Sequence, residues 1–84
     1  MTLRQSVDKI MEYAKEHEYD VNFAYLRMAH LLTTGELKDI TADELNNAHK
    51  FLKSHYDETV LARKGKGLDK YMKALAEWNN EHHV

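Results

Sequence analysis

The 84-residue chain contains no proline, and its three glycines stand at positions 35, 65 and 67. Between these breaks the sequence is rich in helix formers, and its apolar residues recur at three- and four-residue spacing instead of alternating. The chain therefore divides into helical segments, and nothing in it predicts a strand. We predict an all-α fold, a small bundle of about four helices over residues 3–18, 21–33, 42–63 and 68–81.

Two of these helices begin with a capping box, in which the cap residue and the third helical residue satisfy each other's backbone N–H groups. Thr2 and Gln5 have this spacing at the first helix, and Thr41 and Glu44 have it at the third. The second box is also flanked by the two apolar residues of a hydrophobic staple, Ile40 and Leu45. The third helix therefore has the best-defined start in the sequence.

The first two helical segments differ in how much of their circumference is apolar. Residues 3–18 carry one narrow apolar stripe on an otherwise charged helix, formed by Leu3, Val7, Ile10, Met11, Ala14 and His17. Residues 21–33 are apolar over more than half of the helix. A helix that is apolar almost all round is buried, so we predict that the second helix is the central one.

The last two segments have narrower apolar faces. The predicted core face of residues 42–63 comprises Leu45, Ala48, Leu52, Tyr56 and Thr59, and residues 68–81 are predicted to turn Leu68, Tyr71, Met72 and Leu75 inward. Four large side chains have no clear place in this core: Phe23, Phe51, Leu61 and Trp78. An up-down bundle and an orthogonal packing both remain open. A fusion of the last two helices is disfavoured by the two glycines between them.

Composition limits the class of protein. A chain of this length forms a single domain, residues 1–84, and without cysteine it has neither disulfides nor a thiolate metal site. Its net charge of −2 argues against general binding to nucleic acid. The first residues lack the apolar segment of a secretory signal, and no run approaches the ~20 apolar residues of a membrane span. We expect a cytoplasmic protein with no membrane association.

The six histidines lack the spacing of a helical metal site, which places ligands one turn apart, as in H-E-x-x-H or E-x-x-H. Within the predicted helices, His55 and Glu58 are the only histidine and carboxylate at this spacing, and one pair does not make a site. We expect His82 and His83 at a frayed end. A nucleophile is not evident either, because Ser54 and His55 are consecutive and diverge by ~100° on a helix. We predict no catalytic residue, no metal and no cofactor.

One stretch of the chain concentrates positive charge, in Arg63, Lys64, Lys66, Lys70 and Lys73. Tyr71 lies within it and Trp78 lies one turn beyond it. On a helical wheel, Trp78 and Ala74 extend an apolar flank past the core face, and Lys70 and Lys73 border that flank. An aromatic anchor rimmed by cations suits an acidic, partly apolar protein surface. The alternative interpretation is that the cations favour the dipole at the end of the third helix and solvate a loop.

We therefore predict a non-enzymatic module that binds another protein, as a small inhibitor, adaptor or assembly factor, or that forms homodimers. The predicted contact surface comprises Arg63, Lys64, Lys66, Lys70, Tyr71, Lys73 and Trp78. A nucleic-acid-associated regulator that uses residues 63–73 is the first alternative. A small enzyme or metal-binding bundle is the second alternative.

Overall fold

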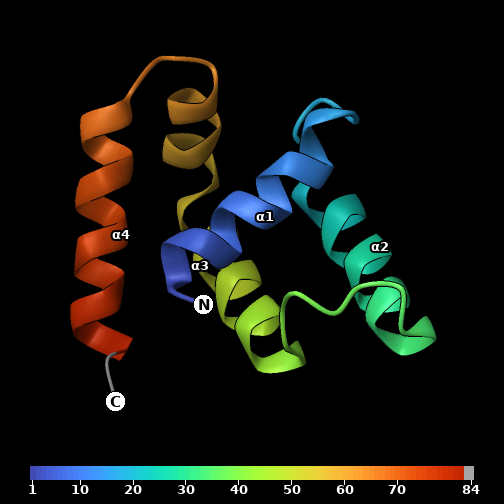
Figure 1. Cartoon of the computed structure of the whole chain (residues 1–84). Helices are drawn as coiled ribbons and strands as arrows, with labels where there is room; N and C mark the ends of the chain where they lie inside the picture. Colours follow the sequence, from blue (N-terminus) through green and yellow to red (C-terminus); the bar gives the residue numbers. More distant parts are fainter. Residues whose placement is uncertain (83–84) are drawn as a thin grey trace.

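The computed structural model describes residues 1–82 and contains four helices over that range (Figure 1). They are α1 (Leu3–Lys15), α2 (Val21–Thr34), α3 (Ala42–Arg63) and α4 (Leu68–His82). No strand occurs in residues 1–82, and none of the four helices is both long enough and apolar enough to cross a membrane. The prediction of a small all-α bundle is confirmed. His83, which we expected at a frayed end, lies outside the described residues, whereas His82 belongs to α4.

The long helix α3 lies at the centre of the molecule and packs against each of the other three helices. Helix α1 packs on both α3 and α2, while α2 and α4 lie on opposite sides of the molecule (Figure 1). The Cα atoms extend over 36 × 32 × 16 Å, so the four helices form a flattened arrangement and not a closed four-helix bundle. Each of the two outer helices therefore has one side that no other helix covers.

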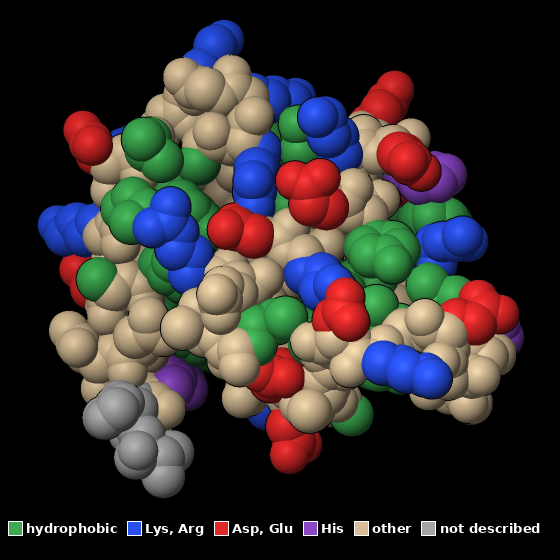
Figure 2. Space-filling model, viewed as in Figure 1, with side chains coloured by type: hydrophobic (Ala, Val, Ile, Leu, Met, Phe, Trp, Pro, Cys, Tyr) green, Lys and Arg blue, Asp and Glu red, His purple; other side chains and the backbone are tan. Residues whose placement is uncertain are grey.

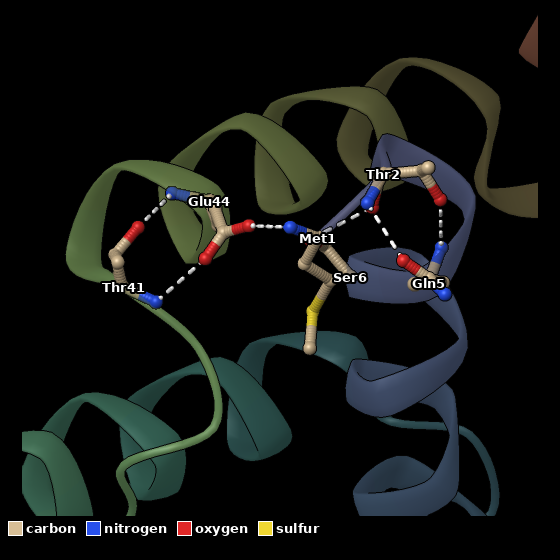
Figure 3. A network of polar contacts seen from close by, with 6 residues as sticks. All are labelled: Met1, Thr2, Gln5, Ser6, Thr41 and Glu44. Atoms are coloured by element: carbon tan, nitrogen blue, oxygen red, sulfur yellow. Dashed lines mark hydrogen bonds and ion pairs between the residues drawn. The ribbon is translucent and has the colours of Figure 1, made fainter.

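Both predicted capping boxes are present (Figure 3). The N–H of Gln5 donates to Thr2 Oγ1 at 3.1 Å, and the N–H of Thr2 donates to Gln5 Oε1 at 2.8 Å. Thr41 and Glu44 exchange the same bonds at 3.1 and 2.9 Å. Four N–H groups that the starts of α1 and α3 would otherwise leave without partners are thus satisfied locally.

Helix α1 ends at Lys15, three residues before the predicted end. Glu18 and Tyr19 adopt left-handed backbone angles, with φ of 55° and 64°, and the N–H of Tyr19 donates to the carbonyl of Ala14 at 2.8 Å. The hydroxyl of Tyr56 on α3 donates to the Tyr19 carbonyl and holds this turn against α3, although the two residues are 37 positions apart in the sequence. The prediction was wrong here because a tertiary contact, which local helix propensity does not include, ends the helix.

The prediction that the second helix is buried and central was also wrong. Only Val21, Ala24 and Met28 of α2 are buried, and Phe23 and Leu26 are 39% and 67% exposed. The helix packs on α1 and α3 along one side and faces away from the molecule on the other. A helix that is apolar almost all round can be buried on any of its sides, and the position of the neighbouring helices determines which side is covered.

The core is built mainly on α3 and α1. Its buried members include Val7, Ile10, Met11 and Ala14 on α1, and Leu45, Ala48, Phe51 and Leu52 on α3. Phe51, which had no clear place in the predicted core, is the largest of the fully buried side chains. Thr59 was predicted on the core face and is fully buried, with its hydroxyl donating to the His55 carbonyl at 3.0 Å.

Helix α3 is kinked at His55, which has non-helical angles of φ −129° and ψ 30°. The predicted bounds of 42–63 match the observed ones, but the sequence did not predict this break. Figure 1 shows the ribbon of α3 unwinding between its two coiled halves. The second half of α3 thereby takes its own direction toward the loop that leads into α4.

The predicted core face of α4 is confirmed for Tyr71 and Leu75 and wrong for Leu68 and Met72. Tyr71, Ala74 and Leu75 are buried, whereas Leu68 and Met72, both predicted to point inward, are 57% and 37% exposed. The rings of Tyr71 and Trp78 pack edge-on against Phe51, with centroids 6.3 and 5.8 Å apart. The buried Phe51 ring therefore sets the rotation of α4, and a helical wheel of α4 alone cannot include its effect.

Candidate protein-binding surface

Three of the predicted contact residues lie where α3 ends and the loop to α4 begins. Arg63 forms an ion pair with Asp8 of α1, so its charge is already matched within the domain. Lys64 holds its ammonium 5.9 Å from the ring centroid of Tyr19, and Lys66 is exposed in the loop. Lys64 and Lys66 are therefore the two cations of this group that are available to a partner.

Lys70 and Lys73 lie on the exposed side of α4 that borders the kinked part of α3. They line a hollow of about 230 Å³ together with His55, Glu58 and Glu77. The two lysines thus stand among two carboxylates, and the surface around them carries both signs of charge. It does not continue the positive charge of Lys64 and Lys66.

Tyr71 is not available to a partner, because only 5% of the residue is exposed. Its hydroxyl is buried and has no hydrogen-bond partner among residues 1–82. Burial raises the pKa of this hydroxyl, and the negative charge of the neighbouring Asp8 raises it further. The inclusion of Tyr71 in the contact surface was wrong, because the packing against Phe51 turns this side chain inward.

Trp78 is half-buried at the edge of the core. Its ring packs edge-on against Phe51 and His55 and stacks on His82 at a centroid distance of 3.7 Å. It lines a pocket that includes neither Lys70 nor Lys73. The predicted aromatic anchor rimmed by these two lysines is therefore not assembled, since the rotation of α4 places the ring and the cations around different hollows.

An exposed apolar cluster instead lies beside the loop between α3 and α4. Leu61, Leu68 and Met72, which we call the hairpin patch, are 40%, 57% and 37% exposed. Leu61 packs against Gly67, where an added Cβ would lie 3.1 Å from the Leu61 Cβ. Figure 2 shows hydrophobic side chains exposed over the beginning of α4, at the upper left, with lysine or arginine side chains beside them.

Sequence reasoning identified only one member of the hairpin patch. Leu61 falls opposite the core face of its helix, and the sequence therefore indicated its exposure. Leu68 and Met72 were assigned to the core because they share a wheel sector with Leu75, which is buried. The helical wheel does show the apolar flank of Ala74 and Trp78, but it does not show which part of the apolar arc the neighbouring helices cover.

A second exposed apolar pair lies on the outer side of α2. Phe23 is in contact with the exposed ring of His17, with centroids 3.9 Å apart, and Leu26 is the most exposed large apolar side chain in residues 1–82. Arg27 and His30 are exposed on the same helix. This pair is smaller than the hairpin patch and has fewer cations beside it.

Among residues 1–82, no three histidine, aspartate or glutamate side chains lie close enough together to hold a metal ion. His49 stacks on Tyr25 at 3.9 Å, and its pKa is lowered by burial and by the charge of Lys53. The contacts of His49 with Asn22 and Tyr25 join α3 to α2.

Comparisons of the chain with protein-family models, with curated proteins and with solved structures find no match.

Proposed function

We propose that this chain is a non-enzymatic protein-binding module, a small inhibitor, adaptor or assembly factor, and that it binds through the hairpin patch. The observation that carries the proposal is the exposure of Leu68 and Met72, one turn apart on α4, and of Leu61, which packs against Gly67 next to Leu68 in the chain. Clustered apolar exposure on a small domain is typical of interaction sites, whereas single exposed apolar residues are common everywhere. Leu68 and Ala74 lie on different sides of α4, and the helix buries Ala74 while Leu68 stays exposed.

The partner surface that fits this patch is apolar at its centre and acidic at its edge. Lys64 and Lys66 stand in the loop next to the patch, and Asp69 is the only acidic residue between Lys64 and Lys73. Opposite charges at the edge of an interface speed association and select partners, while the apolar centre supplies most of the affinity. We also propose a cytoplasmic location, because a cysteine-free chain suits a reducing compartment.

Nucleic acid is a less suitable partner for this surface. Arg63 is paired with Asp8, and Lys70 and Lys73 share their hollow with Glu58 and Glu77. The stretch 63–73 therefore does not form one continuous positive surface of the kind that phosphates require.

A pair of matched double variants tests the proposal. L68S with M72S removes two members of the hairpin patch, and F23S with L26S removes an equal number of exposed apolar residues from α2. In nuclease-treated extract of the source cell, we expect the immobilised wild type and the α2 variant to retain the same proteins and the hairpin variant to lose them. Retention that survives L68S with M72S, or that disappears on nuclease treatment, would contradict the proposal.

Two further measurements separate the forms of the interaction. If the partner is a second copy, sedimentation of the pure chain will show a dimer that L68S with M72S dissociates. If the partner is an acidic protein, K64E with K66E will slow association and reduce its dependence on salt. The pure chain then remains a monomer at the same concentrations.

A further inference from the structure

The exposed side of α4, which lies at one edge of the molecule, carries an apolar row and a charged row of side chains (Figure 1). Leu68 and Met72 are one turn apart and form the apolar row, which belongs to the hairpin patch. Asp69 and Lys73 follow them by one residue each, so the charged row runs along the helix beside the apolar row. All four residues are exposed, and the small, exposed Ala76 continues the apolar row.

The two charges of this row are not matched within the domain. The ion pairs of residues 1–82 join other side chains, and neither Asp69 nor Lys73 takes part in one. Lys73 borders the hollow that contains Glu58 and Glu77, but it forms an ion pair with neither carboxylate. Asp69 and Lys73 therefore stand beside an exposed apolar row with both of their charges open to a partner.

This pattern is complementary to itself when the helix is turned end for end. A twofold axis perpendicular to α4, midway between Asp69 and Lys73, brings Leu68 of one copy next to Met72 of the other. The same axis brings Asp69 of one copy opposite Lys73 of the other, and this happens twice because each copy contributes both residues. In a parallel pair of helices, the twofold axis places the charged rows on opposite edges of the contact, so they do not face each other.

We propose that the hairpin patch is the contact between two copies of this chain, which pair their α4 helices in an antiparallel direction. Leu68 and Met72 form the apolar centre of the contact, and two ion pairs between Asp69 and Lys73 at its edge select the antiparallel direction. The same arrangement directs the exposed Lys66 toward the part of the other α4 that carries Glu77. The inference rests on the function proposed above, because it names the partner of the same patch.

The size of the contact sets the conditions of the experiment. Helix α4 has 15 residues and is about 22 Å long, and the antiparallel overlap uses mainly its first half. Such a contact buries less than the ~1,200 Å² of a stable complex, so the dimer forms only at high protein concentration. We would measure sedimentation equilibrium of the pure chain from about 10 μM to about 1 mM, the range of weak complexes. We expect a monomer–dimer equilibrium, and no dimer in L68S with M72S.

Charge reversals test the antiparallel direction. Asp69→Lys and Lys73→Glu each turn two attractions into two repulsions and should raise the dissociation constant about five- to twenty-fold, since each exposed ion pair contributes modestly. The double variant exchanges the two charges and should restore the wild-type dissociation constant, and an equimolar mixture of the single variants should form a heterodimer. Lys53 and Asp57 are exposed charges with the same spacing on α3. Lys53→Glu and Asp57→Lys are the matched controls and should each leave the dissociation constant unchanged.

The antiparallel dimer is overturned if the pure chain stays monomeric over this range or if L68S with M72S leaves the dimer intact. It is also overturned if the single charge reversals have no effect, as parallel helices predict, or if the double variant fails to restore the dimer. These results are distinguishable from a failure of the proposed function. A monomeric chain that retains proteins from extract, and loses them in L68S with M72S, overturns the dimer alone.

Discussion

The two outer helices, α2 and α4, are held against α3 by different kinds of contact. Helix α4 buries Tyr71, Ala74 and Leu75 and places two rings edge-on against Phe51. Helix α2 buries Val21, Ala24 and Met28, and it adds a stack of Tyr25 on His49 and a hydrogen bond from the Tyr25 hydroxyl to Asn46 Oδ1 at 2.8 Å.

This difference shows how far each helix depends on apolar packing. The contact of α4 consists mainly of apolar and aromatic surface, and the ring of His55 packs edge-on against Trp78 within it. The contact of α2 includes His49, whose Nε2 lies 3.3 Å from Asn22 Oδ1 and whose ring stacks on Tyr25. Both helices nevertheless leave large apolar side chains on their outer sides. We therefore expect variants to separate packing from binding on each helix.

Phe51→Ala should have the largest effect on stability. The ring is fully buried and contacts both Tyr71 and Trp78, so its loss leaves a cavity between α3 and α4. We expect a loss of about 3–5 kcal/mol in the free energy of unfolding, measured by urea denaturation. Phe23→Ala is the matched control, because Phe23 is 39% exposed, and it should cost about 0.5 kcal/mol or less. Equal losses in the two variants would contradict the assignment of Phe51 to the core.

Thr41→Ala tests the start of α3, the helix that carries both outer helices. It removes the hydroxyl that accepts the Glu44 N–H and should lower the free energy of unfolding by about 1 kcal/mol. Thr33→Ala is the control, because the Thr33 hydroxyl only donates to the Ala29 carbonyl within α2. If thermal or urea unfolding shows no difference between Thr41→Ala and wild type, the box does not stabilise α3.

The pH dependence of stability should distinguish α2 from α4. Burial lowers the pKa of His49 below 6.5, so at pH values between the folded pKa and 6.5 the unfolded chain binds more protons. The contribution of His49 to stability is therefore present above pH 6.5 and is lost as the pH falls through that window. We expect urea midpoints to fall less on acidification in His49→Gln than in wild type. His30→Gln, which changes an exposed histidine of α2, should behave like wild type.

L68S with M72S should have the smallest effect on stability, although it changes two large apolar residues of α4. Both side chains are exposed, so their replacement should change the free energy of unfolding by about 0.5 kcal/mol or less for each residue. Circular dichroism melts of this variant, beside Phe51→Ala, would measure the contrast between the two sides of the helix. A loss as large as that of Phe51→Ala would mean that the hairpin patch belongs to the core.

Much of the local structure was predictable because short-range signals determine it. Three predicted helix ends match the observed ones to within a residue. They are the starts of α1 and α3, capped by Thr2 and Thr41, and the end of α2, capped by Gly35 with φ of 82°. The stripe on α1 also predicted its buried residues, since Val7, Ile10 and Ala14 are fully buried. These features depend on neighbours within about one helical turn, and the sequence contains all of that information.

The candidate site was predicted only in part, at the level of chain position. The sequence predicted a contact surface in residues 63–73 with Trp78 as its anchor, whereas the surface that we propose comprises Leu61, Leu68 and Met72, and Tyr71 is buried. The predicted cations do not form one surface. Arg63 forms an ion pair with Asp8, while Lys70 and Lys73 line a hollow together with Glu58 and Glu77. Which side chains share a surface depends on the rotation of α4, and residues on another helix fix that rotation.

By itself the sequence determined that this chain forms four helices and where most of them begin and end, because caps, glycines and apolar spacing act locally. Only the tertiary structure decided that α3 and not α2 is central, that α3 bends at His55, and that α4 turns Leu68 outward. The hydrophobic effect has no direction and rewards any apolar surface that is covered. When a helix carries more apolar residues than its neighbours can cover, the shape of those neighbours selects the buried ones and leaves the others exposed.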